Sequence, residues 1–176
     1  MMQKTEHSQI TKLAIAAVFA ALVCIATIIF TVPIPATSGY FNLGETVIYI
    51  AALLFGPYVG GIAGGIGASV ADMIVAPQFA PGTLVIKLIE GLVVGFLYSK
   101  ISVRTSKSSL SAIVAIIIGG STMIAGYFLY EHLALSYPVA TAAMEIPFNI
   151  VQMLVGLIVS VPVVRIALRI FPQLKS

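Results

Sequence analysis

The amino-acid sequence predicts an all-α integral membrane protein: one domain of six transmembrane helices, with both termini cytoplasmic. Three observations lead to this fold class. First, hydrophobic residues make up 60% of the 176-residue chain, charged residues only 9%, and the mean hydropathy is +1.11. A soluble domain carries about 25% charged residues, so this composition points to a membrane. The others are the division of the apolar residues into long runs and the one-sided placement of the basic residues.

Long apolar runs alternate with short polar or proline-containing connectors. A spanning helix needs about 20 apolar residues, and irregular backbone is excluded from lipid. The first run stops at "VPIPATSG", where Pro33 and Pro35 interrupt a helix. Pro162 is a candidate bend in the last run. The expected spans are approximately 10–31, 43–55, 58–76, 82–100, 109–133 and 139–170.

The basic residues set the orientation, because cytoplasmic loops carry an excess of lysine and arginine. With the N-terminus inside, eight of the nine basic residues fall on the inner side, and the exception, Lys87, lies within a span. The outer loops then hold no lysine or arginine. This topology belongs to a protein of the cell membrane, and the scattered basic residues form no nucleic-acid-binding face.

The second expected span is too short for the bilayer. Its 13 residues, 43–55, cover roughly 20 Å, whereas the hydrocarbon layer is about 30 Å thick. The preceding segment "SGYFNLG" must therefore dip into the protein from outside, where irregular backbone borders protein or a wet cavity. Asn42 and Glu45 match an N-x-x-E capping box at the start of this span. They are equally candidates for a ligand site at the same helix start.

Polar groups inside the membrane carry a high free-energy cost, so those that are present tend to mark functional sites. Apart from Glu6, every acid falls towards the outer side. Lys87 and Glu90 are helical neighbours, so they are interpreted either as an internal ion pair, which Asp72 could join, or as ligand contacts. Near the start of the last span, Glu145 and Asn149 share a helix face at i, i+4 spacing.

Aromatic residues collect at the same level of the membrane. They could form only the interfacial belt in which tyrosine is favoured. Tyr127 and Tyr130, however, share a helix face beside Glu131, and aromatic walls with a few polar groups are typical of small-molecule pockets. The excess of acids over the single Lys87 favours a neutral or amine-bearing ligand. The candidate ligand-binding residues are Tyr40, Asn42, Glu45, Lys87, Glu90, Tyr127, Tyr130, Glu131, Glu145 and Asn149.

Two stretches of small residues predict close helix packing. "GGIAGGIGAS", residues 60–69, spaces its glycines four apart, which lets helix backbones approach in lipid. In the first span, small-residue stripes run through Ala16 and Ala20 and through Ala17 and Ala21. Each stripe could pack inside the chain or against a separate protein.

The motifs of several protein classes are missing from the sequence. No GxxxxGK[ST] motif is present, so ATP hydrolysis by a P-loop route is excluded. His7 and His132 lie far apart and Cys24 is the only cysteine, which leaves no visible metal cluster. No nucleophile–base arrangement is readable. We therefore expect neither an enzyme nor a bound cofactor or metal.

The stretch "NLGETVIYIAALLFGPYVGGIAGGIGASVADMI", followed by "PGTLVIKLIEGLVVGFLY", resembles the substrate-binding S components of energy-coupling factor (ECF) vitamin transporters. Within this group the chain is most similar to the small riboflavin-type S components. The resemblance covers nearly the whole chain and is most specific from Asn42 to Tyr98. The alanine stripes, Ala16/Ala20 or Ala17/Ala21, match the motif by which the family contacts its coupling subunit.

The resemblance implies that the chain binds a vitamin or a vitamin precursor near the outer face, under the loop between the first two spans. It implies as partners a transmembrane coupling protein, called the T protein, and two cytoplasmic ATPases. The ligand could be riboflavin or a thiamine-related pyrimidine. A self-sufficient secondary transporter of a small aromatic or amine solute is the alternative, although the paired broken helices expected of such a fold are not evident.

Overall fold

Helices dominate the fold in the computed structural model, which describes residues 2–35, 37–104 and 108–172. Within these ranges, five helical segments are long and apolar enough to cross a membrane, and a shorter apolar helix, α2, lies among them. The helices are α1 (Met2–Ile29), α2 (Gly44–Phe55), α3 (Pro57–Val75), α4 (Ala80–Arg104), α5 (Ser108–Leu133), α6 (Val139–Ala143) and α7 (Ile146–Ile170). The fold class expected from the sequence is confirmed.

The last expected span consists of two helices. The helical run is interrupted at Met144 and Glu145, between α6 and α7, and α7 then continues through Pro162. Pro147 lies in the first turn of α7, where a missing backbone N–H costs nothing. The interruption therefore follows from Pro147 rather than from Pro162, the residue singled out in the sequence.

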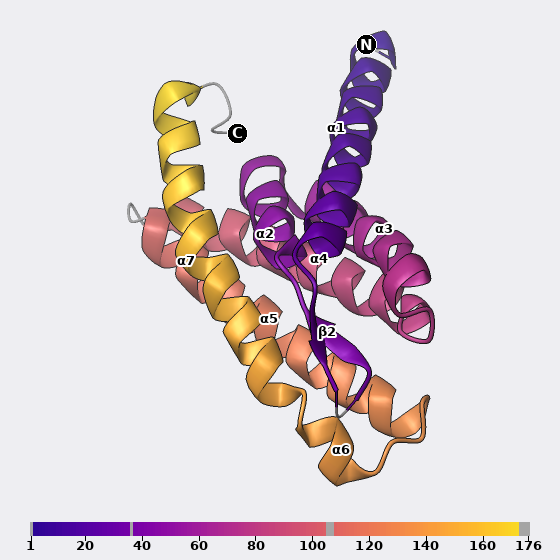
Figure 1. Ribbon diagram of the computed structural model, residues 1–176. Helices are drawn as coiled ribbons and strands as arrows, with labels where there is room; N and C mark the ends of the chain where they lie inside the picture. The colour runs from indigo at the N-terminus through magenta and orange to yellow at the C-terminus, as the bar shows by residue number, and fades with distance from the viewer. Residues whose placement is uncertain (1, 36, 105–107, 173–176) are drawn as a thin grey trace.

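The two termini of the chain lie at one end of the molecule, and the strands and the short helix α6 lie at the other (Figure 1). Figure 1 shows the N-terminal end of α1 and the C-terminal end of α7 at one end, and α6 with the strands at the other. Both termini thus lie at the same end (Figure 1), and if that end is cytoplasmic, as the basic residues predict, the strands and α6 lie on the outer side.

The connection between α1 and α2 is an antiparallel hairpin, which we did not expect. Strand β1 (Val32–Ile34) pairs with β2 (Gly39–Phe41), with Pro33 opposite Tyr40. Proline is tolerated here because each strand of a two-stranded sheet has an open edge. Ser38 has a positive φ of 59° at the turn. The expected recess is present, since α2 has 12 residues and spans about 18 Å, but regular strands rather than irregular backbone lead into it.

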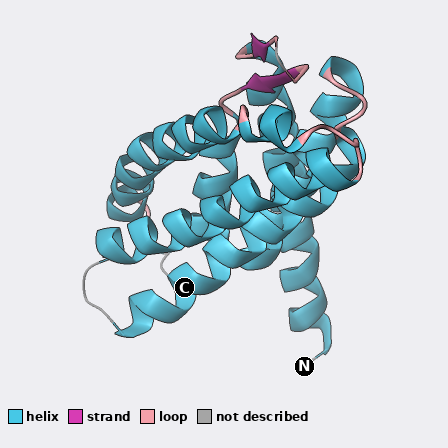
Figure 2. Cartoon of the chain, turned by 90° about the horizontal axis from the view of Figure 1, so that it is seen from below, coloured by secondary structure: helices cyan, strands magenta, loops and turns pink. Residues whose placement is uncertain are grey.

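Helix α3 packs tightly through its glycines. A Cβ at Gly64 would lie 2.9 Å from the Lys87 carbonyl oxygen of α4, and one at Gly60 would lie 2.5 Å from Ala52 Cβ of α2. Figure 2 shows the resulting bundle of closely stacked helices. The glycine stretch therefore packs inside the chain, and its contacts hold α2 and α4 at the distance that lets their polar side chains meet.

A methyl group at the α3–α4 crossing is expected to destabilise the bundle. A Cβ at Gly91 would lie 2.4 Å from the backbone of Gly60, and no flexible side chain is available to move aside. The Gly91→Ala variant should lose about 1–3 kcal/mol of unfolding free energy through overpacking, measured by thermal unfolding in detergent. Ser99→Ala, at an exposed position of the same helix, should unfold like the wild type. Equal stability of Gly91→Ala and Ser99→Ala would contradict this packing.

The two alanine stripes of α1 have different surroundings. Ala16 and Ala20 are buried against α3, and Ala20 lies directly over Gly67. Ala17 and Ala21 are exposed. The first stripe thus packs within the chain and is not open to a partner in this structure, while Ala17 and Ala21 stay the predicted partner contacts.

Candidate functional site

A cavity of about 30 Å³ lies beneath the hairpin in the outer half of the bundle. Helices α2, α3, α4, α5 and α7 all contribute to its walls. Seven predicted ligand-binding residues line it: Tyr40, Asn42, Glu45, Lys87, Tyr127, Glu145 and Asn149. The structure therefore brings together residues that are more than 100 positions apart in the sequence.

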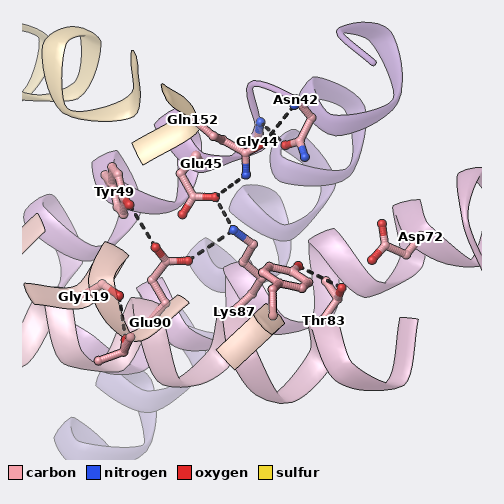
Figure 3. A network of polar contacts seen from close by, with 12 residues as sticks. Asn42, Gly44, Glu45, Tyr49, Asp72, Thr83, Lys87, Glu90, Gly119 and Gln152 are labelled. Carbon is pink, nitrogen blue, oxygen red and sulfur yellow. Dashed lines mark hydrogen bonds and ion pairs between the residues drawn. The ribbon is translucent and has the colours of Figure 1, made fainter. Parts of the chain in front are cut away.

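An ion network lies beside the cavity (Figure 3), and three of its members, Glu45, Lys87 and Gln152, line it. The Lys87 ammonium group donates to Glu45 Oε2 and, at 3.3 Å, to Glu90 Oε2. The Tyr49 hydroxyl donates to Glu90 Oε1 at 2.9 Å. Gln152 Nε2 donates to Glu45 Oε2 at 3.0 Å. These side chains come from three helices, α2, α4 and α7.

The network is fully withdrawn from solvent. Lys87 is 3% exposed, Glu45 1% and Glu90 0%. Desolvating a charged group costs several kcal/mol, and only close opposite charges with further hydrogen bonds offset that cost. The interpretation of Lys87 and Glu90 as an internal ion pair is confirmed, with Glu45 as the additional partner in place of Asp72. Lys87 still reaches the cavity, so it is also placed to contact a ligand.

The start of α2 differs from the capping box that its sequence suggested. Leu43 is the N-cap residue, and no side-chain cap hydrogen bond is present. Asn42 Oδ1 accepts the N–H of Gly44 at 2.9 Å, while the N–H of Asn42 donates to Gln152 Oε1 at 3.0 Å. The predicted capping box is therefore wrong. The Glu45 carboxylate accepts hydrogen bonds from Lys87 and Gln152, and the backbone N–H of Asn42 donates to Gln152.

The hairpin covers the cavity and is fastened on two sides. Tyr40 on β2 donates its hydroxyl to Asp72 Oδ1 of α3. Burial, together with the Asp72 carboxylate, raises the pKa of Tyr40, so this phenol stays a donor. On the other side Thr37 Oγ1 donates to Glu145 Oε1, and the Tyr137 hydroxyl donates to the Thr37 carbonyl oxygen at 3.0 Å. These contacts join the hairpin to α3, to the α5–α6 loop and to the start of α7.

Removing the Thr37 hydroxyl should loosen the hairpin. This oxygen donates to Glu145 and accepts the Gly39 N–H at 3.2 Å, so Thr37→Val loses both bonds without a change in shape. A lost bond to a charged group is worth about 1.5–3 kcal/mol, so amide hydrogen exchange in the hairpin should be faster by tenfold or more. Thr31→Val is the matched control, because the Thr31 hydroxyl donates to carbonyl oxygens at the end of α1 and not to Glu145. Unchanged hairpin exchange in Thr37→Val would show that this bond does not hold the cover.

The remaining walls are an aromatic face and a polar helix face. The Tyr127 hydroxyl and Thr83 Oγ1 are 2.9 Å apart, and the Lys87 ammonium group lies 5.4 Å from the centre of the Tyr127 ring. On α7, Asn149 and Gln152 are buried beside Glu145. The ring is thereby fixed as one wall, and the amide and carboxylate groups of Asn149, Gln152 and Glu145 form another.

Three predicted ligand-binding residues do not line the cavity. Glu90 lies behind Lys87, and the Tyr130 hydroxyl donates to the Gln78 carbonyl oxygen at 2.8 Å. Glu131 is buried and is not among the residues that line the cavity. Nine lining residues were not among the candidates: Thr27, Gly39, Gly44, Ile48, Ala68, Asp72, Phe79, Thr83 and Gln152.

The missed residues differ in how visible they were. Gln152 follows Asn149 by three positions, on nearly the same face, and Asp72 was already noted as an intramembrane acid. Thr27 and Thr83 gave no such signal, because threonine is common in apolar helices, where its hydroxyl can bond to its own backbone. Within residues 2–35, 37–104 and 108–172, no group of three or more His, Cys, Asp or Glu residues could hold a metal ion.

Comparison with known families assigns the chain. The family model of the ECF-type riboflavin transporter, S component, matches residues 7–169. The chain belongs to this family. It is thus an S component, a ligand-binding subunit embedded in the membrane and not an enzyme.

Two relatives and one solved structure illustrate the likeness. An uncharacterized gap 3′-region protein of Pyrococcus woesei is 39% identical over 137 residues, covering 78% of this chain and 88% of that protein. The thiamine precursor transporter HmpT of Lactococcus lactis subsp. cremoris (strain MG1363) is 27% identical over 161 residues, covering 90% and 89%. The crystal structure of an S component for biotin matches with a TM-score of 0.70 at 20% identity, covering 90% of this S component and 91% of the other.

Proposed function

We propose that this S component captures a thiamine-related pyrimidine, or a similar small flat vitamin precursor, in the cavity beneath the hairpin. The ligand enters from the outer side, where the hairpin and α6 lie. The site residues proposed to touch it are Tyr40, Asn42, Glu45, Lys87, Tyr127, Glu145 and Asn149, which line the cavity.

The charge distribution of the cavity carries this proposal. Lys87 is held by Glu45 and Glu90, whereas Asp72 and Glu145 line the cavity without a cationic partner within 4 Å among the described residues. Both accept hydroxyl donors from the hairpin instead. A ligand that carries N–H donors on a flat ring would stack on Tyr127 and donate to these carboxylates. An aminopyrimidine has this chemistry, and a carboxylate or phosphate ligand does not.

The size of the cavity sets a further condition. About 30 Å³ is room for water only, whereas small-molecule pockets measure about 300–1,000 Å³. The hairpin therefore has to shift for a ligand to enter, and the Thr37 and Tyr40 contacts are the ones that must open. A small ring system needs a smaller displacement than a larger ligand does.

The comparisons favour two ligands. The relative HmpT is a thiamine precursor transporter, which supports the pyrimidine. Riboflavin is the second candidate because the family description names it. Its three-ring system would stack on Tyr127 in the same way but requires a wider opening.

Import in this proposal needs partners. The chain contains no P-loop motif, so a T protein and two cytoplasmic ATPases supply the coupling and the ATP hydrolysis. The exposed Ala17 and Ala21 on α1 form the proposed contact with the T protein. Small residues allow another helix to approach closely there.

The proposal is tested by titration calorimetry of the purified protein in detergent. The probes are the aminopyrimidine half of thiamine, riboflavin and biotin. We expect one pyrimidine per chain, with no measurable binding of biotin. Tight binding of riboflavin alone would mean that riboflavin and not the pyrimidine is the ligand, and the proposed receptor function would stand. Binding of none of the three by protein that had been unfolded and refolded to remove bound ligand would overturn the proposal.

Uptake by liposomes that contain only this chain separates the receptor from the secondary transporter. If the chain is a receptor, the liposomes should bind the pyrimidine without accumulating it, under a proton or a sodium gradient. Accumulation of the pyrimidine against its own gradient by the chain alone would favour the secondary transporter.

A further inference from the structure

The side-chain amide of Gln152 uses both of its ends. Its Oε1 accepts the backbone N–H of Asn42 at 3.0 Å, and its Nε2 donates to Glu45 Oε2 at 3.0 Å. Gln152 lies on α7 and is 3% exposed. Asn42 directly follows strand β2, and Glu45 lies in the first turn of α2. One side chain of α7 therefore joins the end of the hairpin to the ion network (Figure 3).

The two partners of Gln152 permit only one orientation of its amide. A backbone N–H can only donate, and an ionised carboxylate can only accept. If the amide turned over, its NH2 group would face the Asn42 N–H and its oxygen would face the Glu45 carboxylate. Two hydrogen bonds would then become two repulsive contacts. Each bond therefore supports the other, because the Asn42 N–H fixes the amide oxygen and the amide nitrogen is thereby held against Glu45.

The bond from Gln152 to Glu45 continues into the buried charges. Glu45 Oε2 also accepts the Lys87 ammonium group, which donates in turn to Glu90 at 3.3 Å. Hydrogen bonds to ionised groups are stronger than those between neutral groups. Opening of the hairpin takes the Asn42 N–H away from Gln152, and the amide is then free to leave Glu45. Buried polar groups that lose their partners are costly, so the network resists opening of the hairpin.

The other fastenings of the hairpin end outside the network. Tyr40 donates to Asp72, and Thr37 donates to Glu145. In the part of the chain that the structure describes, the bond of Asn42 to Gln152 is the hairpin contact that continues to Lys87. Gln152 also lines the cavity, so a direct contact with the ligand is the alternative role that an experiment has to separate.

We propose that Gln152 is a positioning residue that couples closure of the hairpin to the buried ion network. In the closed state Asn42 holds the amide against Glu45, and the network in turn holds the hairpin over the cavity. Gln152 acts through these two residues. Its effect on ligand affinity rests on the function proposed above, whereas the coupling itself exists without a ligand.

Exchanging the two side chains tests the coupling in the ligand-free protein. Gln152→Glu keeps an acceptor for Asn42 but removes the donor to Glu45 and adds a second negative charge. Glu45→Gln removes the charge to which Gln152 is bonded. In the double variant Glu45→Gln, Gln152→Glu the new carboxylate again accepts the Asn42 N–H and the new amide donates to this carboxylate. The double variant thus restores both bonds and the total charge.

Amide hydrogen exchange of the hairpin and of Asn42, in detergent, is the measurement. Gln152→Glu should speed this exchange by about tenfold or more, because a bond to a charged group is lost, and Glu45→Gln by a smaller factor. The double variant should exchange within about threefold of the wild type, because residues in direct contact are not additive. Ser160→Ala is the control on the same helix. The Ser160 hydroxyl is buried without a hydrogen-bond partner among the described residues, so hairpin exchange should stay at the wild-type rate.

Two results would overturn the coupling. One is wild-type hairpin exchange in Gln152→Glu. The other is a double variant whose hairpin exchanges at least as fast as that of the faster single variant. The double variant decides even where a single variant does not fold, because restored folding with slow hairpin exchange shows the same rescue, and continued failure to fold refutes it.

Calorimetry with the aminopyrimidine half of thiamine separates positioning from direct contact. Gln152→Glu should lower affinity by about tenfold, a usual size for coupling between sites, together with its faster hairpin exchange. Lower affinity with unchanged hairpin exchange would make Gln152 a ligand contact and exclude the positioning role. Absence of pyrimidine binding by the wild type, with hairpin exchange rescued in the double variant, would reject the proposed ligand and keep the coupling.

Discussion

Replacing Lys87 with methionine is expected to destabilise the protein by about 3–5 kcal/mol, the usual cost of leaving buried charge without its partner. Lys87 is the cation of the network, and its ammonium group donates to the carboxylates of Glu45 and Glu90. Without it, two carboxylates that are 1% and 0% exposed face each other. Thermal unfolding in detergent measures the loss.

A compensating variant identifies charge as the cause. Adding Glu45→Gln and Glu90→Gln to Lys87→Met removes all three charges and should recover most of the stability, because a neutral network has little desolvation cost to offset. Lys100→Met is the matched control for a lysine at an exposed position. A single Lys87→Met variant as stable as Lys100→Met would mean that the network is not the buried ion cluster described.

Truncating Tyr127 to alanine is expected to weaken binding of the aminopyrimidine by about 30- to 150-fold. The ring is the flat wall proposed to stack on the ligand, and the loss of a large aromatic contact corresponds to about 2–3 kcal/mol, with 1.4 kcal/mol for each factor of ten. Tyr127→Phe keeps the ring and loses only the Thr83 contact, so its affinity should stay within about fivefold of the wild type. Calorimetry on both variants measures the difference.

The control for this comparison is an aromatic residue elsewhere in the membrane protein. Tyr58 is 72% exposed and does not line the cavity beneath the hairpin, so Tyr58→Ala should bind like the wild type. If Tyr127→Ala and Tyr127→Phe lost affinity equally, the hydroxyl group and not the ring would be the ligand contact, and stacking on Tyr127 would be excluded.

The helical membrane fold could be predicted from the sequence because its signals are local. Apolar length, prolines and the placement of basic residues each act within one segment. The short second span also predicted the recess near Asn42, because helix length and bilayer thickness can be compared directly. The hairpin escaped prediction because three-residue strands carry almost no periodic signal, and two prolines in "VPIP" argue against strands in general.

The site was only partly predictable because its contacts are long-range. Helical spacing brought Glu145 and Asn149 together, and the rarity of intramembrane charge singled out Lys87 and Glu45. Spacing within one helix could not show that Lys87 reaches across to Glu45. Equally, the sequence of α5 could not show that Tyr127 lines the cavity while Glu131 is buried away from it, since both orientations satisfy the same helical pattern.

The most direct test of the receptor function is mass spectrometry of small molecules that co-purify with the protein in detergent. The wild type is expected to release one aromatic vitamin or vitamin precursor per chain, and the Tyr127→Ala, Asn149→Ala double variant to release far less. Folding of the double variant is checked by thermal unfolding. Release of no such compound by the wild type from cells supplied with the vitamins, or equal release by the double variant, would contradict a ligand site beneath the hairpin.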